Sequence, residues 1–142
     1  MSMSKDIARD MMQCWESGDF DRARSLVADG ATAWLAHADG ATGAQPNRGT
    51  SMSLIRWLEL LDGVVREMPR GLAVTTHRMI AEGDWVAADV ESVGETDDGR
   101  VYNMRYTFWF EVRSDRIHRL KQFFDTKYGE QFFLDRNKEI PA

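Results

Sequence analysis

Two carboxylates separated by one residue lie in an apolar stretch of the second half of the chain. Asp89 and Glu91 belong to the segment WVAADVESV, and alternate residues of a strand project from the same face. In an apolar concavity two such carboxylates would repel, so at least one would have a raised pKa. A carboxyl group that is partly protonated near neutral pH can donate a proton and take it back. The pair therefore indicates general acid–base chemistry, unless one or both side chains lie at a solvated end of the strand.

The strands that carry these carboxylates form a predicted meander. Alternating apolar residues and turn signals predict strands over about residues 72–81, 85–95, 101–112 and 117–124. Asp98-Gly99 is typical of a two-residue hairpin turn. That turn places Glu91 opposite Tyr106 and Asp89 opposite Phe108, all on one face of the sheet.

The last hairpin leaves two registers open. A two-residue turn at Ser114-Asp115 would place Arg119 and Lys121 on the aromatic face. A three-residue turn would instead place the less polar side chains of this strand there, namely Leu120, Gln122 and Phe124. The second register is favoured because unpaired buried cations are costly.

These registers predict a site on the helix-facing side of the sheet. The predicted catalytic residues are Asp89, Glu91, Tyr106, Gln122 and His77. His77 faces Asp89 if the turn after Glu82 holds three residues, and it points away if the turn holds two. The predicted substrate-binding residues are Trp15, Trp34, His37, Trp57, Met104, Phe108 and Phe124. The alternatives are that the tryptophans only build the core or the pocket wall and that His37 is a surface loop histidine.

Helices precede the strands. Apolar periodicity predicts helices over about residues 4–17 and 20–28 and from Ser51 or Ser53 to Pro69, with a strand at 31–37 and a loop at 38–50. The tail after Asp125 is predicted to form a short helix. Three N-terminal helices followed by a curved, mostly antiparallel sheet form an α+β pattern, and we expect residues 1–142 to form a single domain.

Composition excludes several classes of function. The chain has 142 residues, 43% of them hydrophobic, and a formal net charge of -5 without a basic cluster, which argues against nucleic-acid binding. No apolar run approaches the about 20 residues of a membrane span, and the start has no apolar signal region, so we expect a cytoplasmic location. Cys14 is a lone cysteine, and the histidines lack ligand-like spacing, so no metal and no cofactor is expected.

The stretch HRMIAEGDWVAADVESVGETDDGRVYNMRYTFWFEVRSDRIHRLKQFFDT resembles the sheet half of the SnoaL-like proteins of the nuclear transport factor 2-like superfamily. The segment CWESGDFDRARSLVADGATAW resembles their helical start, so the resemblance covers about residues 4–128. It implies three helices closing over a curved sheet, with a deep pocket at the open end of a cone. It also implies relatives that include isomerases, cyclases, dehydratases, epoxide hydrolases and non-catalytic binders.

The resemblance transfers no single mechanism. Gly99, Arg100, Tyr102 and Asn103 match a GR-x-YN segment of limonene epoxide hydrolase, and an approximate alignment matches one of its catalytic carboxylates with Glu91. Its catalytic arginine falls on Asp89, and its second catalytic aspartate falls on Gln122. The aspartate of SnoaL-type cyclases also falls on Gln122, and the base of ketosteroid isomerase falls near Leu35.

The outer face of the predicted sheet carries a second apolar patch. Trp109, Val90, Ala88 and Phe123 are predicted there and are too apolar for open solvent in aggregate, so we expect a homodimer through this face, as the resemblance also implies. Arg105 is predicted to form an ion pair with Asp125 on the same face.

Two functions follow from the sequence. The leading hypothesis is an enzyme that uses acid–base chemistry on a small apolar organic molecule, of the isomerase, cyclase, dehydratase or hydrolase type. The alternative is a non-catalytic module of the same fold that binds a small ligand or a protein.

Overall fold

A computed structural model describes residues 3–36 and 49–139, with side chains described as far as residue 132. His37 and most of the predicted loop lie outside the described residues. The elements in chain order are α1 (Met3–Ser17), α2 (Phe20–Ser25), β1 (Val27–Leu35), β2 (Thr50–Ser53), α3 (Leu54–Arg66), β3 (Leu72–Glu82), β4 (Trp85–Glu95), β5 (Val101–Arg113), β6 (Arg116–Phe124) and α4 (Thr126–Glu139).

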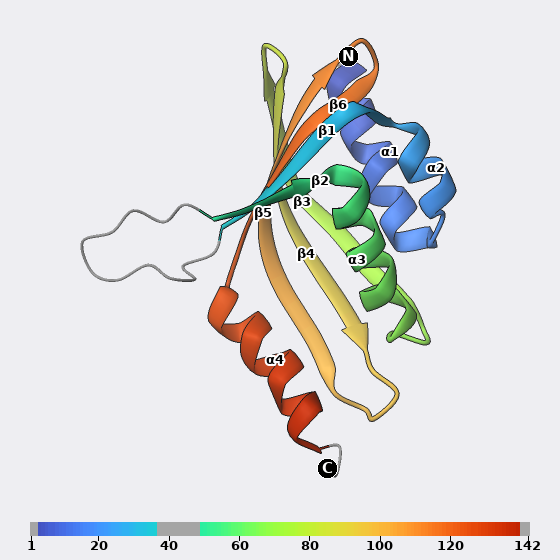
Figure 1. Cartoon of the computed structure of the whole chain (residues 1–142), viewed down its shortest axis with the longest axis vertical. Coiled ribbons are helices and arrows are strands. Elements are labelled where there is room, and N and C mark those ends of the chain that lie inside the picture. The colour runs from blue at the N-terminus through green and yellow to red at the C-terminus, as the bar shows by residue number, and fades with distance from the viewer. Residues whose placement is uncertain (1–2, 37–48, 140–142) are drawn as a thin grey trace, which may run out of the picture.

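The six strands form one sheet in the order β2-β1-β6-β5-β4-β3. Neighbouring strands are antiparallel except β1 and β6, which run parallel. Helices α1, α2 and α3 lie on one side of the curved sheet, which we call the inner side, and α4 lies beside the lower end of β5 (Figure 1). The predicted α+β class with three N-terminal helices is confirmed, and the tail adds a fourth helix of 14 residues.

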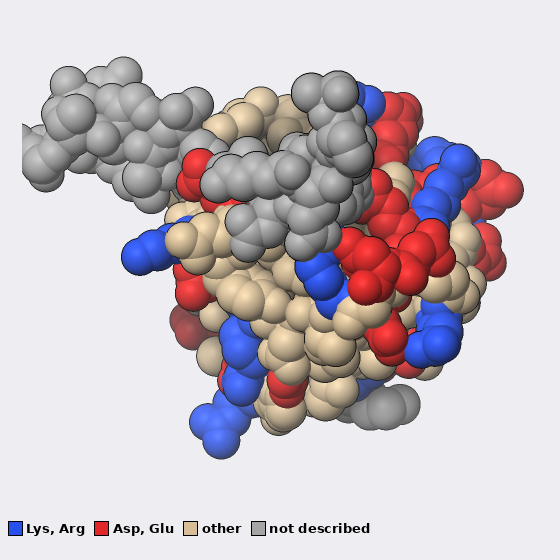
Figure 2. Space-filling view, turned by 90° about the horizontal axis from the view of Figure 1, so that it is seen from below, with Lys and Arg blue, Asp and Glu red and all other residues tan. Residues whose placement is uncertain are grey.

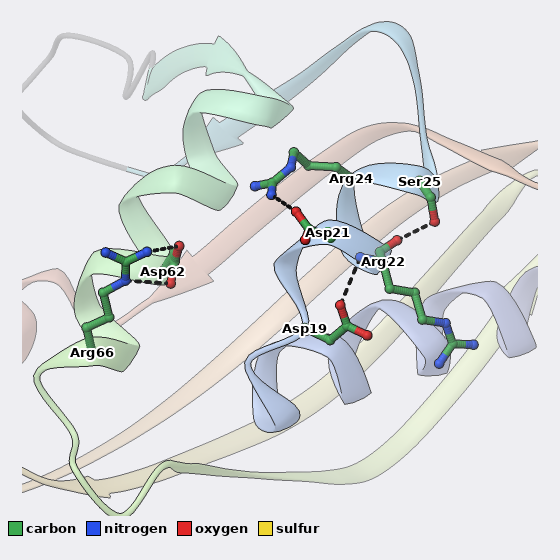
Figure 3. Close-up of polar contacts among 7 residues, drawn as sticks. All are labelled: Asp19, Asp21, Arg22, Arg24, Ser25, Asp62 and Arg66. Carbon is green, nitrogen blue, oxygen red and sulfur yellow. Dashed lines mark hydrogen bonds and ion pairs between the residues drawn. The ribbon is translucent and has the colours of Figure 1, made fainter.

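Helix ends are fixed by short polar side chains. The carboxylate of Asp19 accepts a hydrogen bond from the backbone N–H of Arg22 at 3.1 Å and caps α2 (Figure 3). Ser53 accepts one from the N–H of Arg56 at 3.1 Å and caps α3. These bonds satisfy donors that the first helical turn leaves free, so α3 begins at the later of its two predicted starts.

The hairpin between β4 and β5 differs from the prediction by one residue. The backbone N–H of Thr96 donates to the carbonyl of Arg100 at 2.9 Å, which leaves three residues, 97–99, in the loop. Gly99 has φ of 85°, the left-handed conformation that three-residue hairpin loops need at this point. Glu91 therefore pairs with Arg105 and not with Tyr106.

This shift turns every side chain of β4 to the opposite face. Val86, Ala88 and Val90 point inward and are buried, while Asp89 and Glu91 lie on the outer face with Arg105. The predicted pairing of the carboxylates with Tyr106 and Phe108 is wrong. So is half of the predicted outer patch, because Ala88 and Val90 belong to the core.

The other two hairpins have two-residue turns followed by bulges. Ser114 and Asp115 have φ of 51° and 63°, as a type I′ turn requires, and the register then shifts between Glu111 and Val112. The bulge brings Leu120 and Gln122 to the inner face, so the predicted face is confirmed and the predicted three-residue turn is wrong. Glu82 pairs with Trp85 around a two-residue turn, and a bulge before Arg78 leaves His77 without a paired residue on β4.

The core consists of two apolar clusters that meet on the inner face. The larger cluster packs Trp15 of α1 and Trp57 of α3 against Phe108 and Phe110 of β5. The smaller cluster contains Met68, Leu72, Tyr102 and Met104, with Tyr128 and Phe132 of α4 packed against it. Half-buried side chains that contact both clusters lie at their junction, namely Val65, Val74 and Tyr106.

Helix α4 covers a strand edge. β6 ends opposite Tyr106, so the first residues of β5 have no β6 partner on that side. The Tyr128 hydroxyl of α4 accepts a hydrogen bond from the N–H of Asn103 at 3.0 Å and donates to the carbonyl of Val101 at 3.4 Å. Asp125 accepts a hydrogen bond from the N–H of Tyr128 at 2.9 Å and caps α4.

None of the helices in the described ranges is long and apolar enough to cross a membrane.

Candidate functional site

The structure divides the predicted site residues between two faces. Seven of them lie on the inner side: Trp15, Trp57, Met104, Tyr106, Phe108, Gln122 and Phe124. Four lie on the outer side. Asp89, Glu91 and His77 form polar contacts there, and Trp34 packs on Phe123 with 5.3 Å between ring centroids. The shared cavity of carboxylates, Tyr106 and Gln122 that the sequence predicts is therefore absent among the described residues.

The two carboxylates form an ionised network on the outer face. His77 Nε2 lies 2.9 Å from Glu91 Oε1, and Asn103 Nδ2 donates to Glu91 Oε2 at 3.2 Å. These hydrogen bonds, that of His77 first, lower the pKa of Glu91 below its ordinary value. Arg105 donates to both oxygens of Asp89 at 2.9 and 3.1 Å and likewise lowers the pKa of Asp89. The raised carboxyl pKa that the sequence predicts is wrong.

The predicted ion pair between Arg105 and Asp125 is also wrong. Arg105 pairs with Asp89, and Asp125 is engaged by the first turn of α4. The physical reason is again the register of β4, which places Asp89 beside Arg105.

Two tyrosine hydroxyls form the polar centre of the inner face. Tyr102 and Tyr106 are four residues apart on β5, so both point inward, and their hydroxyl groups are hydrogen-bonded to each other. Burial raises the pKa of Tyr102 to about 12 and raises the pKa of Tyr106 as well. Both phenols are therefore protonated at neutral pH and act as hydrogen-bond donors rather than as bases. Sequence reasoning missed Tyr102, although its spacing from Tyr106 was a usable signal.

A second polar contact lies deeper in the interior. The indole Nε1 of Trp57 on α3 donates to the amide Oε1 of Gln122 on β6 at 2.8 Å. Close by, the indole Nε1 of Trp15 is enclosed and has no hydrogen-bond partner. The tyrosine pair and the side-chain amide of Gln122 therefore give the inner face polar groups that suit a carbonyl or ether oxygen of an otherwise apolar molecule.

No group of three His, Cys, Asp or Glu side chains within the described ranges is arranged to hold a metal ion. Seen from below, acidic side chains gather on the side that carries α1, α2 and α3, and uncharged residues form much of the middle of the view (Figure 2). The uncharged lower end of the molecule is therefore better suited to an apolar molecule than to a cation (Figure 2).

The outer face has a groove of its own. It has a volume of about 780 Å³ and is lined by Glu82, Gly83, Asp84, Trp85, Trp109, Arg119, Lys121 and Phe123. Arg119 Cζ and Lys121 Nζ lie 4.9 and 5.5 Å from the Trp85 ring. Trp109 and Phe123 remain 37% and 41% exposed, so their predicted outward positions are confirmed.

The chain combines a curved six-stranded sheet with three helices on its inner side (Figure 1). The sequence model of a family described as SnoaL-like domain matches residues 8–120, and the chain belongs to this SnoaL-like family. No curated protein matches the chain.

Solved structures share the fold at low sequence identity. AclR from Streptomyces galilaeus, a proposed hydroxylase, superposes with a TM-score of 0.73 at 13% identity, covering 99% of this chain and 89% of its own. IdmH from Streptomyces antibioticus, a proposed polyketide cyclase, gives 0.72 at 22%, with 88% and 94% covered. An epoxide hydrolase of M. tuberculosis described as LEH-like gives a TM-score of 0.68 at 16% identity, with 94% of this chain and 90% of its own covered.

Proposed function

We propose that the chain binds a small, largely apolar organic molecule against the inner face and polarises one of its oxygens with the tyrosine pair. The observation that carries the proposal is the hydrogen bond between Tyr102 and Tyr106 in an aromatic interior. When Tyr102 donates to Tyr106, the hydroxyl of Tyr106 keeps its own O–H for a ligand. A hydrogen bond in a low-dielectric interior is stronger than in water.

A donor held at this point favours reactions in which charge develops on a carbonyl oxygen. Enolisation, isomerisation and ring closure next to a carbonyl all place negative charge on that oxygen in the transition state, and a preorganised donor stabilises it. Tyr106 and Gln122, two of the predicted catalytic residues, are available for this role. Asp89, Glu91 and His77 are better explained as members of the outer network.

The second candidate function is non-catalytic binding of the same kind of ligand. It is favoured by the position of Asp89 and Glu91, because both carboxylates are turned away from the inner face and are held ionised by their partners. A pocket that only binds needs the aromatic walls and the donors but no base.

Tyr106→Phe tests the proposal. We expect it to weaken binding of an apolar ketone about two- to tenfold, the contribution of one hydrogen bond, without changing the fold in circular dichroism. A turnover assay on cyclic ketones then separates the two functions, since a catalyst accelerates exchange of the α-hydrogens for deuterium above its rate in buffer and a binding module does not. Unchanged ketone affinity in the variant would refute the role of the tyrosine pair.

We also propose that two copies associate through the outer face. Exposed Trp109 and Phe123 lie beside a groove whose rim carries the acidic Glu82 and Asp84 and the basic Lys121. A surface with both signs of charge around an apolar centre can complement a second copy of itself.

A further inference from the structure

The side-chain amide of Gln122 has one of its two ends fixed. An indole N–H donates and has no acceptor site, so the atom of Gln122 that lies 2.8 Å from Trp57 Nε1 is the amide oxygen. We infer that Trp57 is a positioning residue: it holds the NH₂ group of Gln122 turned away from its own indole ring and available to a ligand, so that the site selects ligands with a hydrogen-bond acceptor at that point. The inference rests on the proposed function, because it concerns the same inner face.

The NH₂ group of Gln122 is free to meet a ligand. Gln122 is only 8% exposed, and no described residue accepts a hydrogen bond from its nitrogen. Nevertheless this nitrogen is not among the fully enclosed unpartnered atoms of the described residues, which are Trp15 Nε1 and Arg100 Nη2. The nitrogen of Gln122 therefore keeps some exposed area and an unfilled donor, which a ligand oxygen can satisfy.

Both partners of the contact are held firmly. Trp57 is 5% exposed and lies between Trp15 and Phe108, with ring centroids 5.1 and 6.2 Å away. Gln122 lies on β6 between Leu35 of β1 and Phe108 of β5. The backbone and the indole ring therefore have little freedom to adjust if the amide rotates.

Rotation of the amide would place donor against donor. With the NH₂ group turned to Trp57, the hydrogen bond is lost and two N–H groups face each other in a dry interior. The orientation with NH₂ toward the ligand is thus maintained by Trp57 before any ligand arrives, which reduces the entropy lost on binding.

The expected selectivity concerns a carbonyl group on a planar apolar skeleton. Two probes with the same three-ring skeleton separate it from general hydrophobic binding: anthraquinone-2-sulfonate carries two carbonyl oxygens, and anthracene-2-sulfonate carries none. The measured quantity is the ratio of their dissociation constants by equilibrium dialysis. We expect the native chain to bind the quinone more tightly.

Trp57→Phe keeps an aromatic ring and removes the N–H. We expect it to reduce the preference for the quinone about two- to tenfold while the affinity for anthracene-2-sulfonate stays constant. Gln122→Met, which keeps the length and loses the amide, should reduce the preference by a similar factor. Trp34→Phe on the outer face is the matched control and should leave both constants unchanged.

Each result has a definite meaning. Equal weakening of both probes by Trp57→Phe would show that Trp57 only packs, and loss of the preference in Gln122→Met alone would show that Trp57 does not position the amide. An unchanged preference in Gln122→Met would overturn the inference even if Trp57→Phe fails to fold. If neither probe binds the native chain, the proposed function falls and the inference falls with it.

Discussion

Replacing Tyr102 with phenylalanine removes one hydroxyl of the inner pair and keeps the ring. Tyr106 then loses its hydrogen-bond partner in an environment that already raises its pKa by burial. A buried hydroxyl without a partner costs about 1–3 kcal/mol. We therefore expect Tyr102→Phe to lower the free energy of unfolding by about this amount.

The double variant Tyr102→Phe/Tyr106→Phe tests the hydrogen bond between the two hydroxyls more directly. When both hydroxyls are absent, neither leaves the other without its partner, and replacement of both partners by apolar groups of similar shape costs less than removal of one. The double variant should therefore cost less than the sum of Tyr102→Phe and Tyr106→Phe, with a coupling of about 0.5–3 kcal/mol.

Urea unfolding measures these differences. With a slope of about 2 kcal/mol per molar urea, a change of about 2 kcal/mol moves the midpoint by about 1 M. Tyr102→Phe combined with Trp109→Phe, a residue on the opposite face, should be additive and is the control. Additive costs for the two tyrosines, within about 0.3 kcal/mol, would refute the hydrogen-bonded pair and weaken the proposed function.

Three further outcomes are expected. Trp109→Glu should place a charge in the outer groove and reduce self-association in sedimentation. Leu60→Glu, at an exposed position of α3, is the control and should leave self-association unchanged. A native chain that stays monomeric at micromolar concentration would contradict the dimer. Gly99→Ala should lower the free energy of unfolding by about 1–2 kcal/mol, because φ of 85° strains any side chain there. Gly63→Ala within α3 is the control and should raise the free energy of unfolding by about 0.5–1 kcal/mol. Equal effects of the two substitutions would contradict the three-residue turn. The folded state raises the pKa of Tyr102 to about 12, so the protonated tyrosine stabilises the fold below pH 10. This contribution to the free energy of unfolding should be lost as the pH rises from 10 toward 12. The loss over this pH range should be smaller in Tyr102→Phe.

The register error on β4 shows how far sequence reasoning reaches. Asp98-Gly99 suits a two-residue turn, but the side chain of Thr96 stabilises a three-residue loop. Its hydroxyl oxygen accepts a hydrogen bond from the N–H of Arg100 at 3.2 Å. The burial cost that correctly kept Arg119 and Lys121 off the inner face applies equally to Asp89 and Glu91. That argument alone would have turned the carboxylates outward.

Other features could not be read from single residues. The bulges in β3 and β6 depend on how neighbouring strands curve. The residue types at the bulged positions, His77 and His118, do not predict them. Nevertheless, the inward positions of Tyr106, Phe108 and Gln122 were predicted, because apolar side chains dominate one face of β5 and β6. The bond between Trp57 and Gln122 joins residues 65 positions apart, so it depends on how α3 docks on the sheet.

The bulge at His77 has a consequence for aggregation. β3 forms an edge of the sheet, and an edge strand of 11 residues offers unpaired backbone groups to any other exposed strand. The extra residue at His77 interrupts the even spacing of those groups, and Arg78 and Glu82 add charges along the same strand. The bulge that brings His77 to Glu91 thereby also hinders backbone pairing between β3 and an edge strand of another molecule. A variant with a regular β3 would be more prone to form fibres.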